Sequence, residues 1–140
     1  MSIIKKFIFI IFLTTFTNLV NAEEVKKMGT HKDWVTYIIK SDAGKVCFAQ
    51  SKPVLQAPKT NPREARLFIS FRPGENVANE ISVTSGYEYN NKNSITAISG
   101  KNRYKFDIIK ENFAWITDNK FEKKMIKLMQ KGSRIMVKAH

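Results

Sequence analysis

Few side chains in this sequence could take part in catalysis. The two histidines, the usual general bases beside a nucleophile, are His31 in a polar stretch and His140 as the last residue. Neither belongs to a segment that we expect to hold it rigidly. Glu75, Glu80 and Glu88 lie close enough in sequence for the carboxylate pair of a glycosidase,, but acids are common on every protein surface. The sequence therefore predicts no catalytic residues and a protein that is not an enzyme.

Metal and cofactor sites are not indicated either. A structural zinc site needs several ligands at set spacing, and the single cysteine, Cys47, is far in sequence from both histidines. The glycines stand singly at turn signals and form no phosphate-binding loop. The run from Val46 to Ala49 is apolar on both strand faces, so we expect the Cys47 thiol to be buried. The alternative is a thiol that is available to another chain. We expect no bound metal and no cofactor.

The first 22 residues have the organisation of an export signal. Lys5 and Lys6 form a positive region, residues 7–16 are almost wholly apolar, and residues 20–22 (Val-Asn-Ala) suit a signal peptidase,. The apolar run is shorter than the about 20 residues of a membrane-spanning helix, and no later segment approaches that length. We expect a cleaved signal peptide over 1–22, no transmembrane segment after cleavage, and a periplasmic or cell-envelope location. An uncleaved anchor is the alternative.

The chain is strongly basic. It contains 24 Lys and Arg against 12 Asp and Glu, a formal net charge of +12 at pH 7, and such a charge attracts anionic partners over long distances. Lysine far outnumbers arginine, however, and arginines do not alternate with aromatic residues as in proteins that bind single-stranded nucleic acid. We expect no nucleic-acid partner, and an envelope protein or an anionic envelope component as the partner.

The remaining sequence predicts one small, mainly β domain. Residues 23–33 are polar and are expected to form a loose leader, and the single domain is expected over 34–140. Short runs of β-branched and aromatic residues alternate there with Gly, Pro, Asn and Asp turn signals,. We expect an immunoglobulin-like β-sandwich of about seven strands with one amphipathic helix near the C-terminus. An open barrel is the alternative.

Apolar residues repeat at the spacing of an α-helix between Asp118 and Gly132. Asp118 is a suitable N-cap, and Gly132 suits the position just after the end of a helix. The apolar stripe, which we expect to pack on the sandwich, consists of Phe121, Met125, Leu128 and Met129. The opposite side carries five lysines: Lys120, Lys123, Lys124, Lys127 and Lys131. These lysines are the candidate contact with an anionic surface. The alternative is a solvated face without a ligand.

Six segments occur in an order and spacing that carry a family resemblance. They are Trp34 at the start of the first expected strand, KVCFAQSKP (45–53), RLFISFRPGEN (66–76), VTSGYEY (83–89), FAWITD (113–118) and MQKGSRIMVKA (129–139). In these segments the chain resembles the invasion-associated locus B family of exported proteins in Gram-negative bacteria. The resemblance implies an immunoglobulin-type β-sandwich and supplies no catalytic motif. Members of that family often carry a cysteine pair, whereas this chain has Cys47 alone.

These features together favour a non-catalytic periplasmic or envelope-associated protein with a binding or accessory role. The alternative is an envelope hydrolase that acts on glycan or peptidoglycan. A deep cleft with two facing carboxylates would favour the hydrolase, and a flat surface with scattered lysines would favour the binding protein.

Overall fold

The computed structural model describes residues 23–42, 44–90 and 92–139. The expected signal peptide, residues 1–22, lies outside the described residues. Within them the chain forms ten strands, one short 3₁₀ helix and one α-helix. No helix in these ranges is both long and apolar enough to cross a membrane.

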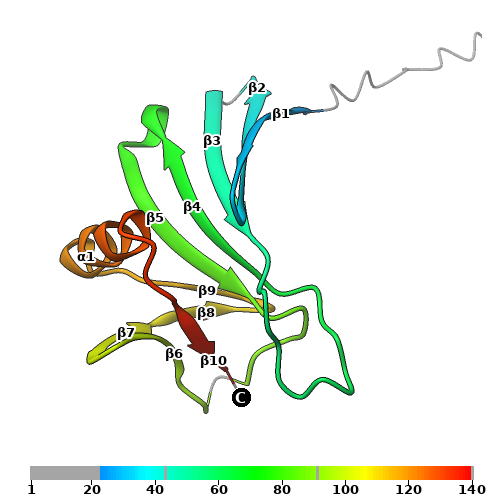
Figure 1. Cartoon of the computed structure of the whole chain (residues 1–140). Coiled ribbons are helices and arrows are strands. Elements are labelled where there is room, and N and C mark those ends of the chain that lie inside the picture. Colours follow the sequence, from blue (N-terminus) through cyan, green and yellow to red (C-terminus); the bar gives the residue numbers. More distant parts are fainter. Residues whose placement is uncertain (1–22, 43, 91, 140) are drawn as a thin grey trace, which may run out of the picture.

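Two antiparallel sheets make up most of the structure (Figure 1). The large sheet has the strand order β1-β2-β3-β4-β5-β9-β8. Its members are β1 (Glu24–His31), β2 (Trp34–Ser41), β3 (Gly44–Ser51), β4 (Arg66–Arg72), β5 (Val77–Thr84), β9 (Phe113–Trp115) and β8 (Ile108–Lys110). The small sheet has the order β10-β6-β7, with β10 (Met136–Lys138), β6 (Ile95–Ser99) and β7 (Asn102–Phe106). The 3₁₀ helix η1 (Pro73–Glu75) lies between β4 and β5, and α1 is Asn119–Gln130.

The expected mainly β architecture with two sheets and a C-terminal helix is confirmed, with ten strands instead of about seven. One extra strand arises where a loose leader was expected, because residues 24–31 form β1 and pair with the whole length of β2. The side chains of β1 are exposed apart from Gly29, so this strand lacks the alternation that marks a half-buried strand,. Backbone pairing holds β1, together with a hydrogen bond that the Thr36 hydroxyl donates to Gly29 O at 3.4 Å. Lys26, Lys27 and a bulge before Gly29 are features that protect edge strands from further pairing,.

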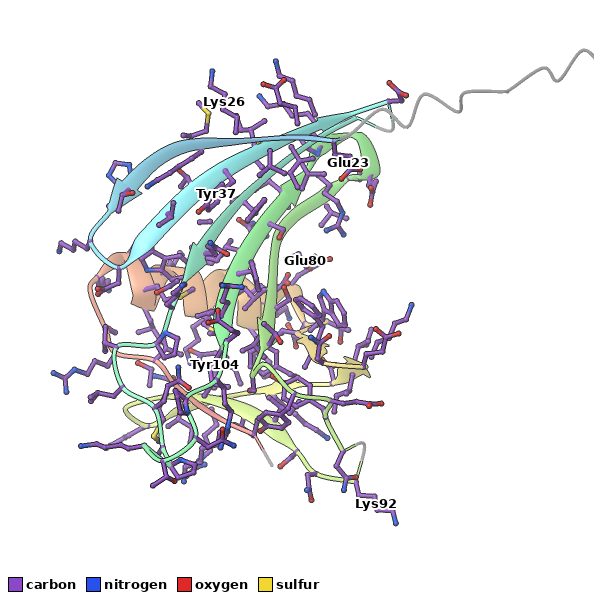
Figure 2. The ribbon with its side chains drawn as sticks, turned by 90° about the vertical axis from the view of Figure 1, so that its right-hand side faces the viewer. Glu23, Lys26, Tyr37, Glu80, Lys92 and Tyr104 are labelled. Atoms are coloured by element: carbon purple, nitrogen blue, oxygen red, sulfur yellow. The ribbon has the colours of Figure 1, made fainter. Side chains whose placement is uncertain are left out.

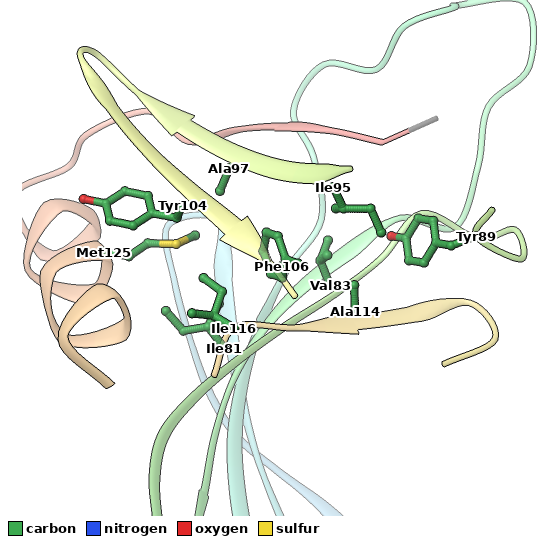
Figure 3. Packing of buried hydrophobic residues seen from close by; sticks show 10 residues of the cluster. All are labelled: Ile81, Val83, Tyr89, Ile95, Ala97, Tyr104, Phe106, Ala114, Ile116 and Met125. Atoms are coloured by element: carbon green, nitrogen blue, oxygen red, sulfur yellow. The ribbon is translucent and has the colours of Figure 1, made fainter. Parts of the chain in front are cut away.

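The buried core lies between one end of the large sheet, the small sheet and the helix (Figure 3). The largest fully buried side chains come from β5, β6, β7 and α1: Ile81, Ile95, Tyr104, Phe106 and Met125. By contrast, no described side chain of β1, β2 or β3 is fully buried. The first three strands therefore extend the large sheet beyond the core.

Helix α1 begins and ends where the sequence predicts. The Asp118 carboxylate accepts hydrogen bonds from the backbone N–H groups of Lys120 (2.7 Å) and Phe121 (3.2 Å). At the other end, Gly132 has a φ of +76° and donates to Met129 O, while Ser133 N–H donates to Leu128 O. This pair of bonds is the Schellman arrangement, which uses the left-handed conformation that glycine adopts readily.

The apolar stripe of α1 packs on the core as expected. Met125 is 0% exposed, and Leu128 and Met129 are partly buried against the same cluster. Phe121 is 42% exposed, but its ring meets the buried Tyr104 ring edge to face at 5.8 Å. The stripe therefore joins the helix to both sheets.

A candidate binding face on the large sheet

The five lysines expected to contact an anionic surface are all exposed on α1 or at its C-terminal end. They take part in none of the ion pairs found among the described residues. The structure therefore brings these lysines together on the solvent side of the helix, and shows no ligand group beside them.

A second surface, which the sequence did not reveal, lies on the large sheet. Because side chains alternate along a strand, one face of this sheet points to the core and the other points away. In Figure 2 the large sheet stands in front of α1, so the viewer sees the face that the helix does not cover. Strand pairing places five aromatic side chains on this outer face: Tyr37, Phe48, Phe68, Phe113 and Trp115. We call them the aromatic row.

The rings of the aromatic row are in continuous contact. Tyr37 and Phe48 stack with centroids 5.1 Å apart and planes 16° apart. The following steps, from Phe48 to Phe68 and from Phe68 to Phe113, measure 6.2 and 5.9 Å. Phe113 and Trp115 complete the row with a stack at 5.7 Å. The row therefore crosses the sheet from β2 to β9 without a polar gap between rings.

Strand β5, which lies between β4 and β9, contributes only small residues beneath this row. Ser82 is opposite both Phe68 and Trp115, and Thr84 is opposite Phe113. Both small residues are buried although they point away from the core. The neighbouring rings close over them, which is how Phe68 and Phe113 come into contact across β5.

A shallow hollow of about 340 Å³ opens at the β2 end of the aromatic row. It is lined by Lys32, Asp33, Val35, Tyr37, Gln50, Lys52, Pro53 and Val54. Gln50 Nε2 donates a hydrogen bond to the Tyr37 hydroxyl at 3.3 Å, which holds the phenol at the hollow. Val54 and Leu55 are 74% and 78% exposed, so apolar surface continues from the row onto the loop between β3 and β4.

This loop, residues 52–65, is tied to the body of the domain. The Gln56 side chain exchanges two hydrogen bonds with the backbone of Arg63, at 2.9 and 3.2 Å. The Arg63 guanidinium lies 5.0 Å from the centre of the Tyr87 ring, a favourable cation–π distance. At Gly86, which has a φ of +75°, an added Cβ would lie only 2.8 Å from Glu64 N. The loop backbone at Glu64 thus lies so close to the backbone at Gly86 that only a residue without a Cβ fits there.

The acids considered for glycoside chemistry are not arranged as an independent pair. Glu80 binds the Arg72 guanidinium through both oxygens, at 2.8 and 2.7 Å, and Glu75 binds the same group at 2.8 Å. The hydrogen bonds that Arg72 donates to Glu80 are the main reason that the pKa of Arg72 lies above its usual value. Glu88 is exposed in another part of the chain. Arg72 therefore holds both of the acids that do come together, so neither carboxylate is left without a cationic partner.

Glu122 is a buried acid that the sequence analysis missed. Only 4% of it is exposed, and its Oε1 accepts the Ile81 N–H at 3.0 Å. Ile81 belongs to β5, and its carbonyl oxygen accepts the N–H of Ile116, just beyond the end of β9. Glu122 thus replaces the backbone acceptor that a longer β9 would provide. Burial raises the pKa of Glu122, against the opposite effect of the hydrogen bond from Ile81.

The remaining candidate residues do not form a reactive group. Cys47 is half-buried in β3, so the expectation of a fully buried thiol was wrong, because the core does not extend to this strand. His31 is exposed at the end of β1, and His140 lies outside the described residues. Within the part of the chain that the structure describes, no group of three or more His, Cys, Asp or Glu side chains could hold a metal ion.

No family model matches this chain, and no curated protein or solved structure does. The resemblance to the invasion-associated locus B family therefore stays a prediction.

Proposed function

We propose that this chain is an exported, non-catalytic protein of the cell envelope whose aromatic row is its binding surface. The observation that carries the proposal is the row itself. Five aromatic side chains in continuous contact lie on the face of the large sheet opposite the core. Each ring is half-buried and leaves part of its surface uncovered. Contiguous apolar surface on a protein commonly marks an interaction site, and aromatic residues are enriched at the centres of protein interfaces.

The surroundings of the row support the same role. Ile108, which is opposite Trp115, extends the row by a further exposed apolar side chain at β8. Val54 and Leu55 do so at the other end. Polar groups that could orient a ligand, Gln50 and the Tyr37 hydroxyl, line the hollow. An apolar centre with a polar margin is the usual arrangement of a binding interface.

Export can be tested on the protein isolated from the cell envelope. Since residues 1–22 have the three regions of a cleaved signal, we expect the mature chain to begin at Glu23,. N-terminal sequencing together with the intact mass measures this directly. A mature protein that still carries Met1 to Ala22 would contradict cleavage and would support the uncleaved anchor.

The binding role can be tested by photo-crosslinking in living cells. A photoreactive phenylalanine analogue in place of Phe48 should give discrete products of higher mass, because this position lies in the middle of the row. The same analogue in place of Lys105, an exposed residue of β7, is the matched control and should give none. Equal crosslinking from both positions, or none from Phe48, would contradict a binding role for the row.

A further inference from the structure

The positions of charged residues around the aromatic row suggest what kind of ligand it accepts. Strand register places Lys27 of β1 directly opposite Tyr37, and Lys110 of β8 directly opposite Phe113. Cross-strand partners point to the same face of a sheet, so a lysine stands beyond each end of the row. Two more lysines, Lys32 and Lys52, line the hollow beside Tyr37. All four are exposed, and they take part in no ion pair between described residues.

The middle of the same face carries little free charge. Between the two end lysines, the outer face presents rings together with Gln50, Ser70, Ser82 and Thr84. It also presents Arg66, which is opposite Thr84 and is paired with Glu64 at 2.7 Å. Of the acids beside the row, Glu80 is bound by Arg72 through both of its oxygens, and Asp33 lies in the hollow with Lys32 and Lys52. Across the outer face of the sheet, the side chains are therefore cationic at one edge, apolar in the middle and cationic at the other edge.

The length of this band requires an extended ligand. Lys27 and Lys110 belong to the two edge strands of the seven-stranded sheet. Six strand spacings of about 4.8 Å separate them across the sheet. Lys27 is in register with Glu80 of β5, whereas Lys110 is in register with Thr84, so the band also runs diagonally along the strands. At about 3.3 Å per residue, this offset makes the band roughly 30–35 Å long. A helix of roughly 21 residues has this length, since it rises about 1.5 Å per residue.

On the basis of the proposed function, we infer that the aromatic row binds an amphipathic polypeptide segment with apolar side chains along its middle and acidic residues at both ends. The apolar side chains cover the rings, and the two acidic ends meet Lys27 and Lys110. A sheet face of this kind is normally covered by a helix or by another sheet, and here the partner supplies that layer.

Three other occupants fit these observations less well. A second copy of the chain would bring the same lysines together. The strongly positive net charge, +12 for the whole sequence and still positive after loss of Lys5 and Lys6 with the signal, would oppose association,. A sugar chain stacks on open ring faces, whereas Tyr37 and Phe48, like Phe113 and Trp115, stack on one another. A flat bilayer contacts protruding side chains, whereas the rings of the row are half-buried in the sheet.

The test uses the protein purified from the envelope and a blocked synthetic helix of roughly 21 residues, the length set by the band. The probe has leucines along one side and glutamates in its first and last turns. A second peptide has lysines in place of the glutamates, and a third has the same composition in scrambled order. We expect the glutamate peptide alone to bind measurably in fluorescence anisotropy, and more weakly as salt is raised.

Charge reversal at the two ends of the row then tests the geometry. The double variant Lys27→Glu/Lys110→Glu should bind the glutamate peptide roughly tenfold more weakly, because attraction at both ends becomes repulsion. The matched control is Lys26→Glu/Lys105→Glu. Lys26 is the neighbour of Lys27 but points to the other face, opposite Ile38, and Lys105 is an exposed residue of the small sheet. This control makes the same change in net charge and should bind like the unmodified protein.

Several outcomes would overturn the inference. They are no binding of the glutamate peptide, equal binding of the lysine peptide, or an equal loss of affinity in both double variants. Self-association through the row would assign it to a second copy of the chain. Binding to phosphatidylglycerol vesicles or to peptidoglycan fragments would assign it to that ligand, if the binding requires Phe48 and the glutamate peptide does not displace it. Crosslinks from Phe48 that do not depend on Lys27 and Lys110 would retain the proposed function and remove only the acidic-ended partner.

Discussion

Met125→Ala is expected to lower the free energy of unfolding by about 2–5 kcal/mol, because it removes a fully buried side chain and leaves a cavity between α1 and the sheets,. This loss is a large share of the stability of a small domain. Urea unfolding followed by circular dichroism measures it, with the midpoint and the slope compared to those of the unmodified protein.

The matched control for Met125 is on the opposite side of the same helix. Replacing Lys123, Lys124 and Lys127 with glutamine leaves the packing intact and should change stability by only a few tenths of a kcal/mol per site, since exposed charges contribute little,. If Met125→Ala unfolds at the same urea concentration as the unmodified protein, α1 does not pack on the core in solution.

Glu122→Leu should be less stable than Glu122→Gln by about 1–3 kcal/mol, the usual cost of a buried donor without an acceptor. Both substitutions remove the charge, but only leucine removes the oxygen that accepts the Ile81 N–H. The comparison therefore isolates this hydrogen bond from the cost of burying a carboxylate. Equal stability of the two variants at neutral pH would show that the Ile81 N–H finds another partner.

The charge of Glu122 should appear in the pH dependence of stability. Burial raises its pKa above the ordinary value of 4.5, so the folded protein binds this proton at pH values where the unfolded chain has already released it. Stability should therefore fall as the pH rises from about 4.5 through the raised pKa, and stay lower above it,. Glu122→Gln should remove this part of the slope. An unchanged slope in a series of unfolding curves from acidic to neutral pH would contradict this assignment.

The elements that the sequence predicted well are those with a strong local pattern. Asp118 and Gly132 mark the ends of α1 through bonds within a few residues. In β4, Leu67 and Ile69 share one face of the strand, and the polar Arg66 and Ser70 lie on the other. Strand β1 was missed because a fully exposed edge strand carries no such alternation, and its pairing with β2 is a tertiary contact.

The candidate binding face could not be found from local patterns, because its rings come from positions 37 to 115. One signal was present: Phe68 stands at a position of β4 where Arg66 and Ser70 indicate a polar face. That this ring meets Phe48 and Phe113 depends on the register of β3, β4, β5 and β9, which alternation within one strand does not determine. Glu122 was overlooked for a related reason: in a helix with many charged residues, its place beside the apolar stripe is visible only once β5 is positioned.

The anchoring of residues 52–65 also bears on how fast and how tightly a ligand associates with the hollow. Gln56, Arg63 and Glu64 fix this loop before a ligand arrives, so complex formation does not require a segment to become ordered, and its entropic cost stays small. Docking onto such a prepared surface proceeds at rate constants of about 10⁵–10⁷ M⁻¹s⁻¹. Ligands of this face should therefore differ in affinity mainly through their dissociation rate constants. Their association rate constants should be similar, apart from the electrostatic attraction of the lysines.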